Sequence, residues 1–447
     1  MKRLVSVVCI ILITPLLLWA GGQQEAGEAG DGGAELSYWH LWGGSRTELV
    51  EQLIARFQSE NDGYEFEVTF TPPNELQRKV VMAAGTGALP DVVQVHSSWM
   101  PDVNAKDTLV DLTPYLEEAG IDLEEVLLSA EAKRSRYKDG IYSLPNVTAG
   151  GQGLFFYNKD LMSKAGLDPV ADAPKNWAEF TEVSKTIVDE LNDGEELEVI
   201  AWDPYQMAGQ PATIYFSFGA GYPTISKDGT ESLMDSKGVM ATARKFDEYI
   251  EEVYGEYGGY RAILEWNSKV AGTDTGAAQV QAFIKEAQTF YVSGSWTIGQ
   301  INKGNPEMDF SILPVPGFDG QHGGISKHGW SYSISQSAKN KDAAWEYLKF
   351  ITLSETGNGW FCKQQGRPCP IEAVNDDEVY QEMGRMWENL VKSMSMDIFP
   401  DAPAIHQDVL KPWLRDVPAR RISGENIDDI MLDIDVKYQD YLDDLNE

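Results

Sequence analysis

The hydrophobic and polar positions of the chain alternate between a strand-like period of two and a helix-like period near 3.6. In the first part, ELSYW, YEFEVTF and DVVQV are strand-like, and the last of them is a continuous apolar run. Helical stripes separate them in SRTELVEQLIARF and in ELQRKVVMAAG, which ends at glycine. Ser45 and Glu48 have the spacing of a capping box. This β-α-β-α-β order is typical of a mainly parallel sheet flanked by helices.

The same alternation restarts after YSLPN. GLFFYN predicts a strand, NKDLMSKAG predicts a short helix stopped by Gly166, and Asn176 with Glu179 predicts the cap of a second helix. We expect ELEVIAW to be a strand and residues 206–218 and 236–253 to be helices. DFSILPVPGF predicts a strand where the chain changes domains, and KNKDAAWEYLKFIT predicts a further helix. The pattern therefore predicts two α/β lobes joined by more than one crossing.

The N-terminal segment predicts export. Lys2 and Arg3 precede a short apolar run that ends at Ala20, which is the pattern of a secretory signal peptide over residues 1–20. Its internal proline and short length argue against a membrane span. Residues 21–34 are rich in Gly, Ala, Gln and acid, and predict a flexible tether. Because position 21 is Gly, a lipid anchor stays open but has no support. We expect a periplasmic or extracytoplasmic protein.

Composition limits the class of partner. The 447 residues include 70 acidic and 36 basic ones, for a net charge of −34. A field of this sign repels nucleic acid and anionic membranes, so we expect no nucleic-acid partner and a monomeric protein. Cys362 and Cys369, in CKQQGRPC, follow the predicted signal peptide. In an oxidising compartment this spacing favours a local disulfide over a metal pair.

Catalytic and metal-binding motifs are missing from the sequence. The five histidines have no HExxH spacing, and the chain has no CxxC, GxSxG, P-loop or GxGxxG motif. We therefore expect no catalytic residue, metal or cofactor. A secreted carbohydrate-active hydrolase stays an alternative, because such an enzyme needs only two facing carboxylates and the chain has 70 acids.

Tryptophan is the most informative residue type. The chain has 13, and several lie beside glycine, proline or polar residues: Trp42, Trp99, Trp202, Trp296 and Trp330. Trp177, Trp345 and Trp387 instead lie in helical stripes and predict core positions. Loops at the carboxyl ends of strands are where open α/β sheets bind ligands, and an indole face packs well on the C–H face of a sugar. The first group therefore predicts a carbohydrate site, although core packing is the alternative for any single member.

Several stretches together resemble the extracellular solute-binding proteins of bacterial ABC transporters, family 1, the group similar to the maltose-binding protein. They are YWHLWGG, MAAGTGALPDVVQVHSSWMPDVNAKDTLVDLTPYL, YKDGIYSLPNVTAGGQGLFFYNKDLMSKAGL with PKNWAEF, YVSGSWTIGQI and ILPVPGFDG, in the family's order. The resemblance implies a two-lobed periplasmic-binding-protein fold of type II with a hinged cleft. It also implies closure on a carbohydrate and delivery to ABC permease subunits. By this likeness the N-lobe takes residues 35–147 and 312–365, and the C-lobe takes 148–311 and 366–447.

The resemblance also implies ligand contacts at matching positions. These are Trp42 and Gly43, Ser98 and Trp99, Gly151 and Gln152, Trp296, and Gly329 with Trp330. Maltose binders carry a glutamate where this chain has Gly151, and an Asp-Arg pair where it has Ser98 and Trp99, so we expect the substrate to be held differently.

Two further polar partners come from the residues themselves. Asp203 lies beside Trp202, and Arg367 lies inside the cysteine loop; a structural salt bridge is the alternative for each. A sensor that binds the same ligand and docks on a receptor differs only in its partner. The sequence does not decide which sugar, linkage or polyol is bound.

Overall fold

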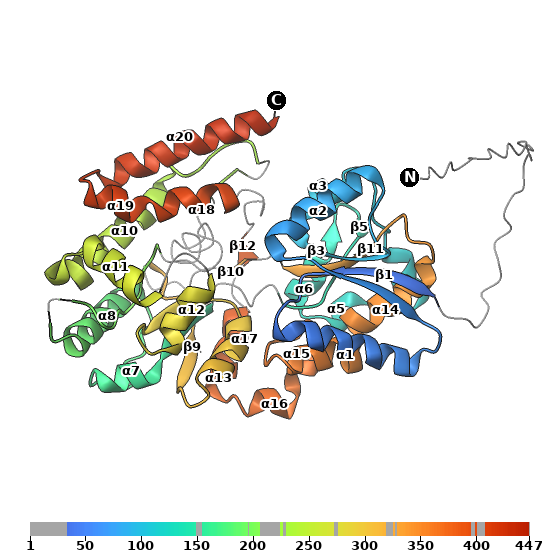
Figure 1. The fold of residues 1–447 in the computed structure, drawn as a ribbon, viewed down its shortest axis with the longest axis horizontal. Helices are drawn as coiled ribbons and strands as arrows, with labels where there is room; N and C mark the ends of the chain where they lie inside the picture. Colours follow the sequence, from blue (N-terminus) through green and yellow to red (C-terminus); the bar gives the residue numbers. More distant parts are fainter. Residues whose placement is uncertain are drawn as a thin grey trace, which may run out of the picture.

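Two α/β lobes lie side by side, each built around its own sheet (Figure 1). The computed structural model describes residues 34–148, 154–194, 196–205, 224–226, 229–271, 276–318, 325–326, 329–394, 398–399 and 407–446. The predicted signal peptide, all of the tether except Ala34, and the helix expected over 206–218 lie outside these ranges. Among the described helices, none combines the length and apolar character that a membrane crossing needs.

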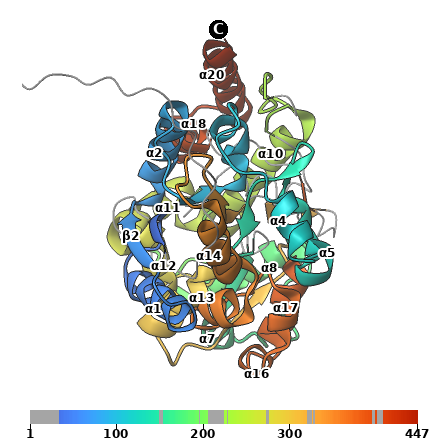
Figure 2. The same ribbon diagram turned by 90° about the vertical axis from the view of Figure 1, so that its right-hand side faces the viewer.

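The N-lobe sheet has five strands in the order β2-β1-β3-β11-β6. β1 runs parallel to β2 and β3, whereas β11 is antiparallel to β3 and β6. Its strands are β1 Glu35–His40, β2 Glu65–Phe70, β3 Val92–His96, β6 Leu144–Pro145 and β11 Trp330–Ile334. Helix α14 packs on β11 and β6 and contacts α1, as the view onto this lobe shows (Figure 2).

The other elements of the N-lobe are short, apart from α1, α2 and α14. They are α1 Ser45–Glu60, α2 Pro73–Thr86, the 3-10 turn η1 Ser97–Trp99, α3 Met100–Val103, α4 Thr113–Glu118, α5 Leu123–Val126, α6 Ser129–Arg134, the hairpin β4 Arg136–Tyr137 and β5 Gly140–Ile141, α14 Lys341–Leu353, η6 Glu355–Gly359 and α15 Trp360–Lys363. Gly87 ends α2 with φ 71°, a left-handed conformation that suits glycine.

The C-lobe sheet has the order β8-β7-β9, and β7 is antiparallel to both neighbours. Its strands are β7 Leu154–Asn158, β8 Phe290–Ser293 and β9 Phe310–Leu313. Alternation along β7 sends Phe155 and Tyr157 into the core formed with α8, α10 and α20, and Phe156 into the core on the opposite face. Both faces of the sheet are therefore covered.

Helices supply most of the C-lobe. They are α7 Lys159–Lys164, α8 Trp177–Leu191, α10 Lys237–Tyr254, η3 Gly255–Tyr257, α11 Tyr260–Trp266, η4 Asn267–Ala271, α12 Gly276–Ile284, α13 Trp296–Gly304, α17 Arg385–Met394, α18 Gln407–Arg415, α19 Val417–Ile422 and α20 Ile427–Asn446. Two short elements follow α15 and precede α17 in the sequence: η7 Glu372–Asp376 and α16 Glu378–Gln381. Two short strands, β10 Ile325–Ser326 and β12 Ile398–Phe399, pair in parallel.

The predicted fold class is confirmed, with three corrections of detail. The expected mainly parallel arrangement holds for β1, β2 and β3, but the described strands of the C-lobe sheet pair antiparallel. The segment ELEVIAW contributes only an isolated bridge, between Ile200 and Gln288. The capping box predicted at Ser45 is wrong, because α1 begins at Ser45 and Gly44 (φ 65°) occupies the cap position. The cap predicted at Asn176 is confirmed, since its side chain accepts from the Glu179 N–H at 3.0 Å.

The chain crosses between the lobes three times. The first crossing joins β6 to β7, the second joins β9 to β11, and the third leads from α15 to α17, which packs against β9. Leu313 pairs within the C-lobe sheet, and Ile371 forms an isolated bridge with Leu127 of the N-lobe. The lobe boundaries stay predictions.

Candidate ligand-binding site

Four loops meet at one edge of the N-lobe sheet, which we call the N-lobe edge. Because β11 is antiparallel to its neighbours, its first residue, Trp330, pairs with His96 at the end of β3. The edge consists of Leu41–Gly44 after β1, Ser97–Trp99 after β3, Asn146–Thr148 after β6 and Gly329–Trp330 before β11. The structure thus brings together the contacts predicted on three of these loops. The predicted contacts Gly151 and Gln152 lie outside the described residues.

Hydrogen bonds fix the polar part of this edge. The Ser97 N–H donates to the Gly329 carbonyl at 3.0 Å, and the Gly329 N–H donates to Ser97 Oγ at 3.2 Å. The hydroxyl of Ser98 lies 2.7 Å from His96 Nδ1. Ser98 and Gly329 are therefore part of a rigid junction between β3 and β11.

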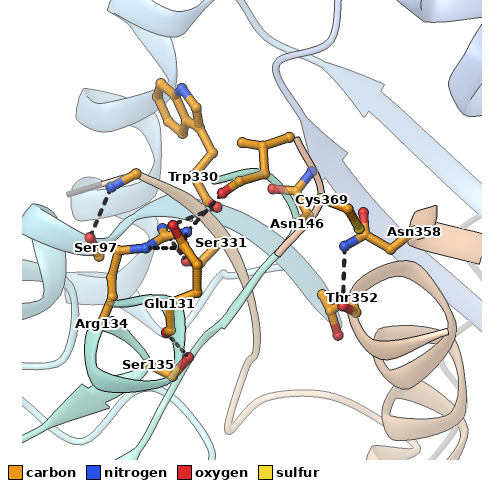
Figure 3. Close-up of polar contacts among 12 residues, drawn as sticks. Ser97, Glu131, Arg134, Ser135, Asn146, Trp330, Ser331, Thr352, Asn358 and Cys369 are labelled. Atoms are coloured by element: carbon orange, nitrogen blue, oxygen red, sulfur yellow. Dashed lines mark hydrogen bonds and ion pairs between the residues drawn. The ribbon is translucent and has the colours of Figure 1, made fainter. Parts of the chain in front are cut away.

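A buried ion pair supports the same junction (Figure 3). Arg134 and Glu131 are each 2% exposed, and Arg134 Nε donates to Glu131 Oε2 at 2.7 Å. The remaining guanidinium nitrogens donate to Ser331 Oγ at 3.2 Å and to the Val147 carbonyl at 2.8 Å. Arg134 therefore ties α6 to β11 and to the start of the first crossing.

Trp330 is the indole of the N-lobe edge that stays half-buried. Its ring meets Trp99 edge to face, with centroids 5.3 Å apart and planes at 83°. His96 contacts it similarly at 4.9 Å. Trp99 itself is buried, so it supports Trp330 and its own ring is not free to stack on a ligand. Ligand contact stays a prediction for both rings, and Trp330 is the one with exposed surface.

Trp42, another predicted ligand contact, is also buried. Its Nε1 donates to Tyr332 Oη at 2.9 Å, and the Arg46 guanidinium lies over its ring at 5.0 Å. Phe361 covers it further, with ring centroids 5.7 Å apart. The ring therefore supports an arginine, a role that the sequence pattern did not indicate.

Two neighbours of Trp42 complete this corner of the edge. Burial lowers the pKa of His40 to about 4, and its Nδ1 accepts from the Trp42 N–H at 3.1 Å, so the imidazole is neutral at pH 7. Phe70, at the end of β2, is 45% exposed, and its ring would lie 2.7 Å from a Cβ on Gly43. Gly43 thus lets this aromatic ring approach the backbone. Sequence reasoning missed Phe70, although the alternation of YEFEVTF places it at a strand end.

On the C-lobe, Trp296 is half-buried and is the first residue of α13. Its ring lies directly on Gly294, where a Cβ would come within 1.9 Å of a ring carbon, so only glycine fits there. One turn later, Ile298 and Gly299 of α13 lie against Gly366 and Gln365 of the third crossing. Trp296 is therefore next to the region where the lobes join.

Trp202 and Asp203 lie in the C-lobe, away from the N-lobe edge. Trp202 is buried among aromatic rings of the C-lobe core, including Trp177, Phe180 and Phe246. Asp203 is buried too, and accepts from the Tyr205 N–H and from Asn267 Nδ2, each at 2.9 Å. Ligand contact at these two residues stays a prediction. The core positions predicted for Trp177, Trp345 and Trp387 are confirmed.

The predicted disulfide is absent from the structure. Cys362 and Cys369 are free and buried. Cys362, in α15, directs its thiol toward the Asn146 carbonyl at 3.6 Å and Asn358 Oδ1 at 3.8 Å. Burial raises the pKa of the Cys369 thiol, which keeps it protonated. Within the described ranges, no cluster of His, Cys, Asp and Glu could hold a metal ion.

The comparisons with known proteins agree with this architecture. The model of the bacterial extracellular solute-binding protein family matches residues 43–357. YcjN of Escherichia coli K12, named as an ABC transporter periplasmic-binding protein, is 19% identical over 358 residues, 77% of this chain and 76% of its own. An sn-glycerol-3-phosphate-binding periplasmic protein of Shigella flexneri is 28% identical over 152 residues, which cover 33% of this chain and 34% of its own.

Among solved structures, the sugar-binding protein MalE of Xanthomonas citri superposes with a TM-score of 0.72 and 19% identity, covering 92% of this chain and 98% of that one. At this identity the likeness concerns the fold, which is the type II periplasmic-binding-protein fold. Because the family model matches most of its length, the chain belongs to the bacterial extracellular solute-binding proteins.

Proposed function

We propose that this protein is the extracytoplasmic substrate-binding component of an ABC importer, and that it captures a carbohydrate between its lobes and delivers it to the permease. The observation that carries the proposal is the pair of half-buried tryptophans, Trp330 on the N-lobe edge and Trp296 on the C-lobe, each beside a crossing. An indole face suits the C–H face of a sugar ring. That the X. citri neighbour is a sugar-binding protein is consistent with this ligand class.

Buried polar atoms at the first crossing support a ligand rich in hydroxyl groups. Asn146 Oδ1 and Thr148 Oγ1 are buried, and neither has a hydrogen-bond partner in the part of the chain that the structure describes. Leaving such groups unsatisfied costs about 1–3 kcal/mol each. Hydroxyl groups of a bound sugar would satisfy them.

The mechanism involves binding and domain movement, with no bond broken and no cofactor. A sugar held by Trp330 and Trp296 together favours the arrangement in which the lobes are close, to the extent that it binds this arrangement better. The three crossings connect the lobes during this movement. The permease then distinguishes the ligand-bound protein by the relative position of the two lobe surfaces.

Thermal unfolding with a panel of maltose, maltotriose, mannobiose, galactobiose and glycerol tests the proposal. A ligand at 100 times its Kd adds about 2.7 kcal/mol to stability, which raises the Tm by a few degrees in a protein of this size. The double variant Trp296→Ala/Trp330→Ala should abolish the shift. Trp413→Ala is the matched control, because Trp413 is half-buried against the C-lobe core and belongs to α18, which is not part of any of the three crossings in the sequence.

Other outcomes would decide for the alternatives. If no member of the panel raises the Tm and an oligosaccharide is cut, the protein is a hydrolase. Unchanged sugar binding in the double variant would contradict the assigned role of the two tryptophans. Pull-down with permease or receptor subunits separates the importer from a sensor with the same ligand.

A further inference from the structure

Arg367 is a buried cation. It is 2% exposed, and its Nε is buried with no hydrogen-bond acceptor among the described residues. No carboxylate of these residues forms an ion pair with it. Arg134 is equally buried but has Glu131. Because an unpaired buried charge costs several kcal/mol, folding alone does not account for Arg367.

A second unpaired arginine lies nearby. The Arg46 guanidinium lies over the Trp42 ring, and no described carboxylate pairs with it. Burial, followed by repulsion from Arg46, lowers the pKa of Arg367 to about 10, so both arginines stay cationic at pH 7. The titratable groups that face Arg367 besides Arg46 are Cys362, Tyr380 and Cys369, and burial raises the pKa of Tyr380 and Cys369. None of these groups supplies a carboxylate.

The two arginines lie where the loops of the candidate site meet. Trp42, which supports Arg46, contacts Phe361 in α15, and the Arg367 N–H donates to the Cys362 carbonyl at 3.2 Å. Gly366, the residue before Arg367, lies against Ile298 of α13, the helix that Trp296 begins. The pair of arginines is therefore between the N-lobe edge and the C-lobe helix that carries the second exposed indole.

Local backbone adds to the positive potential. Arg46 is in the first turn of α1, a helix of 16 residues whose cap residue, Gly44, offers no side-chain acceptor. The amino end of a helix carries partial positive charge. In a chain with 70 acidic against 36 basic residues, two neighbouring arginines without an acid are unlike the paired arginines elsewhere, such as Arg244 with Asp428 and Arg421 with Asp247.

We propose that the carbohydrate bound at this site carries a carboxylate or a phosphate, and that Arg46 and Arg367 bind this anionic group. The inference rests on the proposed function and narrows its substrate class. A guanidinium binds either anion through two parallel N–H···O bonds. The role of Trp42 is to hold Arg46 in position beside Arg367.

The first test needs no ligand. Thermal unfolding of the full protein compares Arg367→Met with Arg134→Met, because methionine fills similar space without charge. If Arg367 is kept for a ligand, Arg367→Met leaves the Tm unchanged or raises it, whereas Arg134→Met lowers it by several degrees. A comparable loss in both variants would show that Arg367 is structural and would overturn the proposal.

The second test uses glucose, glucuronate, glucose 6-phosphate and inorganic phosphate at matched ionic strength, with Kd measured by calorimetry. We expect glucuronate or glucose 6-phosphate to bind more tightly than glucose, which also distinguishes the carboxylate from the phosphate. Arg367→Met and Arg46→Gln should weaken anion binding by roughly ten- to a hundredfold. Arg56→Gln is the matched control, because Arg56 lies 4.9 Å over the Trp360 ring in the same stacked arrangement.

The two proposals fail in different ways. If neutral sugars of the panel bind and none of the anionic probes binds better than glucose, the anionic class is wrong and the carbohydrate importer stands. If anions bind equally to wild type and Arg367→Met, the assigned residues are wrong. If neither anionic nor neutral probes bind, both proposals fail. If Arg367→Met does not fold, Arg367→Lys is used in its place. Lysine keeps the positive charge but lacks the two parallel N–H donors of the guanidinium. Unchanged anion affinity in Arg367→Lys would overturn the proposal.

Discussion

Tryptophans with similar sequence neighbours have different environments in the two lobes. In the sequence, Trp330 of the N-lobe and Trp202 of the C-lobe both stand next to polar or turn-forming residues. The ring of Trp330 contacts Trp99 and His96 and stays half-exposed. Trp202 is enclosed by aromatic rings from α8 and α10. The difference in exposure therefore comes from the helices that pack around Trp202 and not from the local sequence.

The lobes also differ in the charges that they bury. Next to the N-lobe edge, the side chains of Arg134 and Glu131 form a pair that is 2% exposed. On the C-lobe, the side chains of Arg244 and Asp428 are 50% and 40% exposed, and the buried Asp203 accepts hydrogen bonds from neutral groups. Because buried charge is costly, we expect the loss of one partner to affect stability more in the Arg134–Glu131 pair than in the Arg244–Asp428 pair.

Replacing Trp202 should have the largest effect on the free energy of unfolding, and it tests whether Trp202 and Trp330 differ in burial. Trp202→Ala should lower the free energy of unfolding by about 5 kcal/mol, the upper end for a tryptophan, because packed rings surround the cavity. Trp330→Ala should cost less than half as much, since part of its surface is already in water. Urea unfolding followed by circular dichroism measures both. Equal losses would mean that Trp330 is as much a core residue as Trp202.

The buried ion pair gives the next largest effect. Arg134→Met leaves Glu131 charged and unpaired, and should cost about 3–4 kcal/mol. Arg244→Met, which breaks a half-exposed pair of the C-lobe, should cost much less, because water screens an exposed ion pair. The double variant Arg134→Met/Glu131→Leu should recover most of the loss. If the two single variants were equally stable, the contrast in buried charge between the lobes would have no energetic meaning.

The sequence predicts features that depend on residues close together along the chain, and it does not predict packing between distant elements. The run DVVQV and the stripe of KNKDAAWEYLKFIT correctly predict β3 and α14, because period and capping act within one element. The cover over Trp202 depends on α8 and α10, which are distant in sequence. Local pattern could not reveal it.

The pairing of two arginines at the candidate site could not be predicted from the sequence for the same reason. The sequence predicts Arg367 as a polar partner of the ligand. Its neighbour Arg46 lies in a predicted amphipathic helix, and nothing in the sequence pattern marks it as a ligand contact. The two come together only when α15 packs beside Trp42. Likewise, the spacing in CKQQGRPC predicts a local disulfide, whereas Cys362 and Cys369 are free and buried in the structure.

Lowering the pH should affect the N-lobe through His40. Its pKa is about 4 in the folded protein against 6.5 when unfolded, so the unfolded chain binds more protons between these values. The contribution of His40 is complete above pH 6.5 and is lost as the pH falls toward 4, by at most about 3 kcal/mol. His40→Asn keeps an acceptor for the Trp42 N–H and should flatten this part of the Tm-against-pH curve. Parallel curves for both proteins would contradict the assignment.

The smallest effect compares helix starts in the two lobes. Asn176 caps α8 in the C-lobe, so Asn176→Ala should cost about 1 kcal/mol. Ser45→Ala should cost only a few tenths, because α1 begins at Ser45 and the cap position belongs to Gly44. The N–H groups of Arg46 and Thr47 already donate to the Gly43 and Gly44 carbonyls at 3.4 Å and 3.2 Å. If Ser45→Ala instead costs as much as Asn176→Ala, the side chain of Ser45 caps α1 and the assignment of the cap position to Gly44 is wrong.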